Sequence, residues 1–176
     1  MPSIKSPFNE GFSRGFRSGL VPSGGGGGAG GTKYLWWRIR ITTAGSYSGG
    51  GLAQIALHDT VGGANIAVGG TASVLGGSSF NGGTLSQYAW DLVDPALEWA
   101  GAANAVTNGI AWSDYTLASA AAVVEVVITA RASVGNQMGT AFNVDGSDDG
   151  LIWNTVWSES GLASWTNGEI RTFTKP

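Results

Sequence analysis

Beyond its first 33 residues the chain alternates apolar with polar side chains, and this period of two constrains the fold most strongly. In the segment YLWWRIRITT, Trp37, Ile39 and Ile41 occupy every second position, while Arg38 and Arg40 stand between them. Successive side chains of a strand point to opposite sides of a sheet. The segment is therefore predicted to be a half-buried strand with one apolar face and one basic face.

The rest of the domain repeats this signature in short pieces separated by glycine-rich turns. Further strands are predicted at residues 52–58, 64–68, 71–75, 112–117, 122–130, 141–147, 151–157 and 168–174. Residues 122–130 are apolar at nearly every position, so we expect burial on both faces. The run Asp148-Asp149-Gly150 predicts a hairpin turn with Gly150 at positive φ. We expect no helix after residue 34 except a turn within 94–105. Many short strands of this kind predict an all-β fold, a jelly-roll β-sandwich.

The first 33 residues differ from this domain in composition and in charge. They carry four basic side chains and one acidic one, a net charge of +3, whereas residues 34–176 carry five basic and eleven acidic ones, a net charge of −6. A glycine-rich segment of this kind cannot bury enough apolar surface to fold by itself. We therefore expect residues 1–33 to be an extended anchoring arm and residues 34–176 to be one domain. The candidate anchors of the arm are large or cationic side chains, which dominate interfaces: Phe8, Phe12, Phe16, Arg14 and Arg17.

The composition disfavours several classes of protein. Without cysteine the chain has no disulfide framework and no cysteine-ligated metal site. Neither a signal peptide nor an apolar run of the roughly 18–20 residues that cross a membrane is visible. The acidic domain makes nucleic acid an unfavourable partner. We predict no nucleic-acid and no membrane partner, and expect the cations of the arm to pair with an acidic protein surface.

Two groups of residues resemble catalytic constellations, and each has a simpler explanation. His58 stands beside Asp59, but adjacent strand residues point to opposite faces and no nucleophile motif accompanies them. Asp145, Asp148 and Asp149 could bind a metal or act as acid and base, but their place in the hairpin signal favours turn chemistry. The chain is predicted not to be an enzyme.

A series of short motifs follows in order along the domain. They are WWRIRIT (36–42), LAQIALHDTVGGANIA (52–67), GGTAS (69–73), AWD (89–91), Trp99, VVEVVITAR (123–131), FNVDGSDDGLIW (142–153) and WTNGEIRTF (165–173). In order and spacing this series resembles the galactose-binding-like jelly roll, the family of discoidin and coagulation factor 5/8 C-terminal domains, in the versions found in phage and bacterial proteins. The motif at 142–153 is the most specific of them. The arm has no counterpart in that family.

This resemblance implies a non-catalytic domain that binds glycans, lipid head groups or proteins through loops at one end of the barrel. It also implies a structural calcium beside the loop that follows the motif AWDL (89–92). The candidate ligands there are Asp91, Asp94 and Glu169, together with backbone carbonyls. The glycine that usually follows the aspartate in the family is missing here. The alternative is that Asp91 caps its own loop.

Aromatic residues near the loop end are the candidate ligand contacts, because a ring offers a sugar an apolar face of defined geometry. We expect ligand-binding loops at 45–51, 76–88 and 100–112, which contribute Tyr47, Tyr88 and Trp112. Four tryptophans match family positions in the core or beside it: Trp37, Trp90, Trp99 and Trp153. Four others are less constrained: Trp36, Trp112, Trp157 and Trp165.

Arm and domain together predict a non-enzymatic accessory protein of a phage virion, such as a capsid decoration, tail or fibre component, assembled in the host cytoplasm. The arm would bind other virion proteins, and the domain would project outward and adhere to a host-surface glycan or serve a purely structural role. The alternative function is a carbohydrate-binding module of a bacterial surface or enzyme complex.

Overall fold

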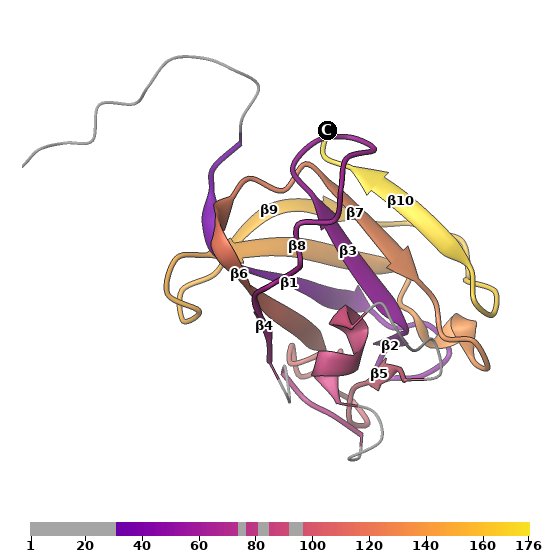
Figure 1. The fold of residues 1–176 in the computed structure, drawn as a ribbon. Helices are drawn as coiled ribbons and strands as arrows, with labels where there is room; N and C mark the ends of the chain where they lie inside the picture. The colour runs from indigo at the N-terminus through magenta and orange to yellow at the C-terminus, as the bar shows by residue number, and fades with distance from the viewer. Residues whose placement is uncertain (1–30, 74–76, 81–84, 92–96) are drawn as a thin grey trace, which may run out of the picture.

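The computed structural model describes residues 31–73, 77–80, 85–91 and 97–176 (Figure 1). The arm residues 1–30, and with them the five candidate anchors, lie outside the described residues. Across the described residues the fold is all-β, with short 3₁₀ turns at Ser86–Trp90 and Gly135–Gln137. The predicted fold class, an all-β sandwich of antiparallel sheets, is confirmed.

The larger layer is a five-stranded antiparallel sheet in the order β4-β6-β1-β8-β9. Its strands are β4 (Thr71–Ala72), β6 (Trp112–Ala121), β1 (Tyr34–Thr43), β8 (Ala141–Ser147) and β9 (Asn154–Glu159). The opposite layer is a three-stranded antiparallel sheet, β10-β7-β3, formed by Ile170–Thr174, Glu125–Thr129 and Gln54–His58. A short pair, β2 (Gly51–Leu52) with β5 (Trp99–Ala100), lies at one end of the sandwich (Figure 1).

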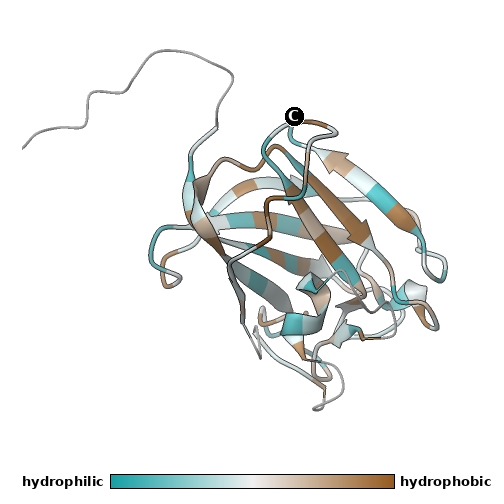
Figure 2. Cartoon of the chain, viewed as in Figure 1, coloured by the Kyte–Doolittle hydropathy of each residue, from teal (hydrophilic) through white to brown (hydrophobic). Residues whose placement is uncertain are grey.

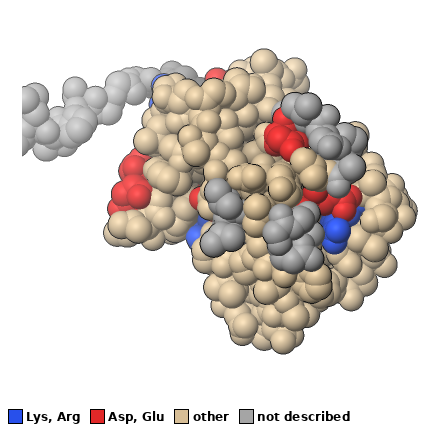
Figure 3. All heavy atoms as spheres, turned by 60° about the horizontal axis from the view of Figure 1, so that its bottom comes forward, with Lys and Arg blue, Asp and Glu red and all other residues tan. Residues whose placement is uncertain are grey.

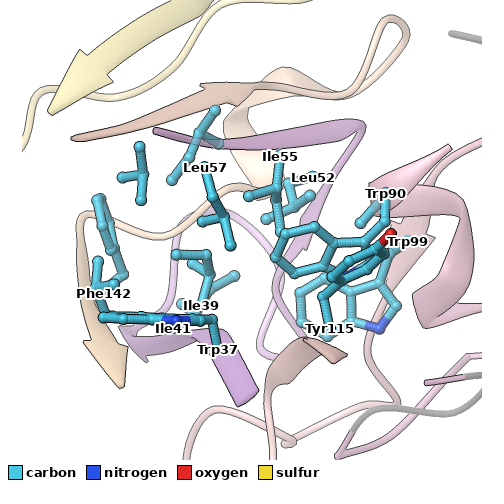
Figure 4. Packing of buried hydrophobic residues seen from close by; sticks show 14 of the residues in the cluster. Trp37, Ile39, Ile41, Leu52, Ile55, Leu57, Trp90, Trp99, Tyr115 and Phe142 are labelled. Atoms are coloured by element: carbon cyan, nitrogen blue, oxygen red, sulfur yellow. The ribbon is translucent and has the colours of Figure 1, made fainter. Parts of the chain in front are cut away.

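The core fills the space between the two layers. The predicted inner face of β1 is confirmed, since Trp37, Ile39 and Ile41 are buried almost completely. In Figure 4 these side chains face Ile55 and Leu57 of β3 across the core. Figure 2 shows hydrophobic residues concentrated along β3 and β7. Alternation along β1 therefore decides which residues enter this core.

Strand β7 is buried less evenly than its apolar sequence predicts. Val126 and Ile128 on its inner side are fully buried, whereas Val127 and Thr129 on the outer side are half-buried. Among the described residues, Figure 1 shows no further sheet over the outer face of the small sheet. Burial on both faces was therefore the wrong expectation for those outer positions.

The predicted strand at 64–68 is also wrong. The Asn65 side-chain oxygen accepts the backbone N–H groups of Leu57, at 2.9 Å, and Ala67, at 3.0 Å, so this segment turns around one side chain. Such local side-chain bonds compete with a strand ladder. Of the turn expected within 94–105, the described part contains β5 and a tight turn from Ala102 to Ala105.

The hairpin predicted at Asp148-Asp149-Gly150 is confirmed, and Gly150 has a φ of +71°. Its return strand starts at Asn154, later than the predicted residue 151. The cause is the Asp149 carboxylate, which takes the N–H groups of Leu151 and Ile152 that a ladder would otherwise use.

The chain enters and leaves the domain at the same end, which we call the entry pole. Tyr34 pairs with Ala121 at the start of β1, and the Lys175 N–H donates to the Val124 carbonyl beside the C-terminus. A groove of about 530 Å³ there is lined by Gly31 together with Thr174, Lys175 and Pro176 among others. The loops 44–50 and 101–111 lie at the opposite end, the loop pole (Figure 1).

Candidate functional site

The outer face of the five-stranded sheet carries the most chemically distinctive cluster among the described residues. Alternation along β1 turns Arg38 and Arg40 away from the core. The sheet register places Arg38 between Asp114 of β6 and Asp145 of β8. Directly opposite side chains in neighbouring strands lie close enough to interact. Arg38 is thus set between two acids, one in each neighbouring strand, whereas Arg40 lies opposite Trp112 and Asn143.

Asp145 is the centre of this cluster and is 1% exposed. Its Oδ2 accepts hydrogen bonds from the Nε of Arg38 and the Nε of Arg40, each at 2.9 Å. Its Oδ1 accepts a bond of 2.7 Å from the Thr155 hydroxyl. A buried carboxylate needs such charged and hydrogen-bonding partners to remain ionised.

The two carboxyl groups beside Arg38 have pKa values that move in opposite directions. Burial would raise the pKa of Asp145, but the bonds from Arg40, Thr155 and Arg38 outweigh it and lower this pKa below its usual range. The pKa of Asp114 is raised, chiefly by burial, against a smaller lowering by Ser73 and Arg38. Burial also lowers the pKa of Arg38. Asp145 is therefore the acid that binds the arginines.

Two tryptophans sandwich the Arg38 guanidinium. Its carbon atom lies 4.8 Å from the ring centre of Trp112 and 4.2 Å from that of Trp153. A third ring, Trp36, packs near Gly150, where an added Cβ would lie 3.1 Å from it. All three rings are half-buried. Stacking on aromatic faces is characteristic of arginine, whose planar cation is weakly hydrated.

We call this strip of Trp112, Arg38, Trp153, Arg40 and Asp145 the sheet-face cluster. Asp145 and the neighbouring Asp114 together balance the two arginines of the cluster in formal charge. Indole rings and guanidinium N–H donors together suit a ligand that has apolar faces and hydroxyl groups. Asp145 already accepts three partners, so among the described residues it is poorly placed to act as a base.

The structure does not gather the three predicted ligand-binding aromatics into one group. The Tyr47 hydroxyl donates to the Gly101 carbonyl at 3.1 Å, and its ring meets Phe80 edge-on at 6.3 Å at the loop pole. Tyr88 lies in the 3₁₀ turn at 86–90, and its carbonyl accepts a bond from Gln54. Trp112 belongs to the sheet-face cluster. The three aromatics predicted to form one loop-end site therefore lie in different environments, and Trp112 is the one that lies beside charged side chains.

The predicted calcium ligands also have different partners. Asp91 accepts a bond of 3.0 Å from the Gln54 side chain. Glu169 binds Arg171 at 2.7 Å and the backbone N–H of Thr166 at 2.8 Å, which lower its pKa to about 2. Asp94 lies outside the described residues. Among the described residues, no group of three or more His, Asp or Glu side chains could hold a metal ion.

The two suspected catalytic groups have new partners in the structure. His58 contacts Glu125 across the small sheet rather than Asp59: its Nδ1 lies 3.6 Å from the carboxylate and 2.7 Å from the Gly63 carbonyl. Asp149 forms the turn as predicted, while Asp145 lies in β8 and binds the arginines. The prediction of a role in the turn is therefore confirmed for Asp149 and wrong for Asp145.

The tryptophans also differ from their expected division. Trp37, Trp90 and Trp99 are in the core as predicted, but Trp153 lies on the outer face with Arg38. Two tryptophans that the sequence constrained less, Trp157 and Trp165, are buried. The inward position of Trp157 follows from its pairing with Val144 in the β8–β9 ladder, which needs the register that only the folded hairpin sets.

Sequence reasoning missed the sheet-face cluster because its members lie on three different strands and on the β8–β9 turn. The alternation in β1 was a sufficient signal for the outward arginines, but their pairing with Asp145 depends on the β1–β8 register.

No protein family, no curated protein and no solved structure matches this chain. Within the described part of the chain, none of the helical segments is long and apolar enough to span a membrane.

Proposed function

We propose that this chain is a non-enzymatic accessory protein of a phage virion, such as a capsid decoration, tail or fibre component. The arm, residues 1–33, binds other virion proteins, and the β-sandwich is displayed on the particle. The contrast between a basic arm and an acidic domain supports this division. A domain with its own closed core needs no partner to bury its apolar residues, whereas the arm does.

The position of the chain ends is the observation that carries this proposal. Gly31 lines the same groove as the C-terminal residues, so the arm joins the domain at the entry pole. The loops 44–50 and 101–111 are at the other pole (Figure 1). An arm held by a particle would therefore leave the sides and the loop pole of the sandwich facing outward.

We further propose that the displayed domain adheres to a neutral glycan through the sheet-face cluster. The half-buried rings of Trp112 and Trp153 supply apolar area, and Arg38 and Arg40 supply N–H donors. Because Asp145 and the neighbouring Asp114 balance the charges of Arg38 and Arg40, an uncharged ligand is favoured over an anionic one. This proposal retains Trp112 from the sequence prediction and replaces the two loop tyrosines by Trp153 and Arg38.

Deleting residues 1–30 tests the anchoring role. We expect the shortened chain to be soluble, to unfold cooperatively and to be absent from purified particles, because the assembly contacts are assigned to the arm. Thermal unfolding by circular dichroism and the protein content of the particles measure the two properties. Normal incorporation of the shortened chain would refute the anchoring role.

Alanine substitutions test the glycan site, and the loop tyrosines provide a matched control. Binding of the intact particle to a glycan array should be lost in Trp112→Ala/Trp153→Ala and kept in Tyr47→Ala/Tyr88→Ala. Many copies on one particle raise the effective concentration, so the isolated chain should bind more weakly. The reverse pattern would move the site to the loop pole, and no binding at all would leave a structural role.

A carbohydrate-binding module of a bacterial surface or enzyme complex is the second candidate, because the sheet-face cluster serves it equally well. The two functions differ in what they require of the arm. A module should bind its glycan and remain in its complex without residues 1–30, while a virion component should lose incorporation.

A further inference from the structure

Two aliphatic side chains at the tip of the β8–β9 turn project into water. Leu151 is 82% exposed and Ile152 is 72% exposed, more than any other exposed large hydrophobic residue in the described part of the chain. They are adjacent in sequence and form one small exposed apolar patch. Exposing apolar area to water is unfavourable, and a contiguous exposed patch is typical of an interaction site.

Hydrogen bonds of the turn hold the backbone of these two residues in place. Asp149 Oδ1 accepts the N–H of Leu151 at 2.8 Å and that of Ile152 at 2.9 Å. The Ser147 hydroxyl accepts the N–H of Gly150 at 3.0 Å, and the Trp153 indole N–H donates to the Gly150 carbonyl at 3.1 Å. A surface that is ordered before binding loses less conformational entropy when it binds.

The tip is also acidic. The backbone bonds from Ile152 and Leu151 lower the pKa of Asp149, so this carboxylate stays ionised at neutral pH. Asp148 precedes it. Figure 3 shows acidic atoms at the left edge of the domain, the side on which Figure 1 places this turn. The small apolar patch is therefore bordered by negative charge, which favours a cationic partner.

The turn lies near the place where the arm joins the domain. Ser147 at its base pairs with Trp36, two residues beyond the start of β1. The arm carries a net charge of +3, with three phenylalanines spaced every four residues and two arginines among them. Its residues 18–30 could span up to about 45 Å when extended, enough to reach an adjacent copy in an assembly.

We propose that the β8–β9 turn is the docking site for residues 8–17 of the N-terminal arm of a neighbouring copy. Leu151 and Ile152 contact the arm's phenylalanines, while Asp148 and Asp149 face Arg14 and Arg17. The arm thereby links copies of this chain within the particle. This inference rests on the proposed anchoring role of the arm.

A titration with a synthetic peptide of residues 1–22 tests the docking site. The host is the full chain with Phe8→Ser/Phe12→Ser/Phe16→Ser, so that its own arm does not compete. We expect the methyl NMR signals of Leu151 and Ile152 to shift on addition of the peptide, and those of Val68 to stay in place. Leu151→Asp/Ile152→Asp should weaken binding at least about tenfold, the size of effect that truncating interface anchors produces.

A matched control is Val68→Asp/Ile170→Asp, because these residues are 61% and 65% exposed elsewhere on the surface. This variant should bind the peptide within about twofold of the host. All four positions are exposed, so the variants should fold, and equal melting temperatures check this. Equal affinity in the two aspartate variants, or shifts confined to other methyl groups, would overturn the docking site.

Particle incorporation separates this inference from the proposed function. If deletion of residues 1–30 abolishes incorporation while Leu151→Asp/Ile152→Asp incorporates normally, the arm anchors to another protein and the docking site is wrong. If the deletion incorporates normally, the anchoring role itself fails. Loss of incorporation in both variants supports both proposals.

Discussion

Trp37 and Arg38 are neighbours in β1, and they face opposite sides of the five-stranded sheet. Trp37 is fully buried between the layers, in the same core cluster as Ile55, and close packing in this core stabilises it. Arg38 lies among polar and aromatic side chains, and its stability depends on one carboxylate and two rings. The comparison shows that the inner face is stabilised by side chains that fill the core, whereas the outer face is stabilised by the balance between the arginines and their carboxylate.

Removing the large ring tests the inner face and should have the largest effect. Trp37→Ala should lower the free energy of unfolding by about 3–5 kcal/mol, because it leaves a cavity in a packed core. Trp36→Ala removes the adjacent half-buried ring of the outer face and should cost about 1 kcal/mol. Urea denaturation of both variants measures the difference, and equal costs would contradict the assignment of the two faces.

Removing the charge of Asp145 tests the outer face. Asp145→Asn should cost about 2–4 kcal/mol at pH 7, because Arg38 and Arg40 then lose their buried counter-ion. Since the pKa of Asp145 is lowered in the folded state, its carboxylate stabilises the fold at pH values above the unfolded pKa of about 3.9. This stabilisation is lost as pH falls through the folded pKa. The variant should therefore lose less stability on acidification below about pH 4 than the original chain.

Asp114 is the matched control for this prediction, because its pKa is raised. A carboxyl group of this kind gains stability as pH falls from its raised folded pKa toward the unfolded value. Asp114→Asn should change stability by less than about 1 kcal/mol at pH 7 and should remove that gain. Unfolding measured from pH 3 to 7 distinguishes the two, and parallel pH profiles would contradict the outer-face network.

Substitution of the glycine in the β8–β9 turn should have a smaller effect than loss of Trp37 or of the Asp145 charge, and it tests the local backbone geometry. Gly150→Ala should cost about 1–2 kcal/mol for the left-handed conformation, with an added contact on the Trp36 ring. Gly161 has a similar φ of +67° but open space around it, so Gly161→Ala should show the backbone cost alone. A smaller loss in Gly150→Ala than in Gly161→Ala would show that the Trp36 contact is favourable.

Much of the fold could be predicted from local pattern. Alternation placed Trp37, Ile39 and Ile41 inside, and the Asp-Asp-Gly run located the β8–β9 turn, because strand period and turn conformation depend on nearby residues. The failure at 64–68 has a local cause as well. There the Asn65 side chain accepts backbone N–H groups that would otherwise bond to a neighbouring strand. The hydrophobic pattern of the sequence does not reveal such side-chain bonds.

The sequence by itself determined the strand pattern, the outward position of Arg38 and Arg40, and the division between a basic arm and an acidic domain. The tertiary structure decided which residues meet: Asp145 with the two arginines, Trp112 with Trp153 around Arg38, and the inward position of Trp157. The physical reason is that strand register is a long-range property. It depends on how the whole apolar set fits between two sheets, and a shift of one residue would exchange the faces.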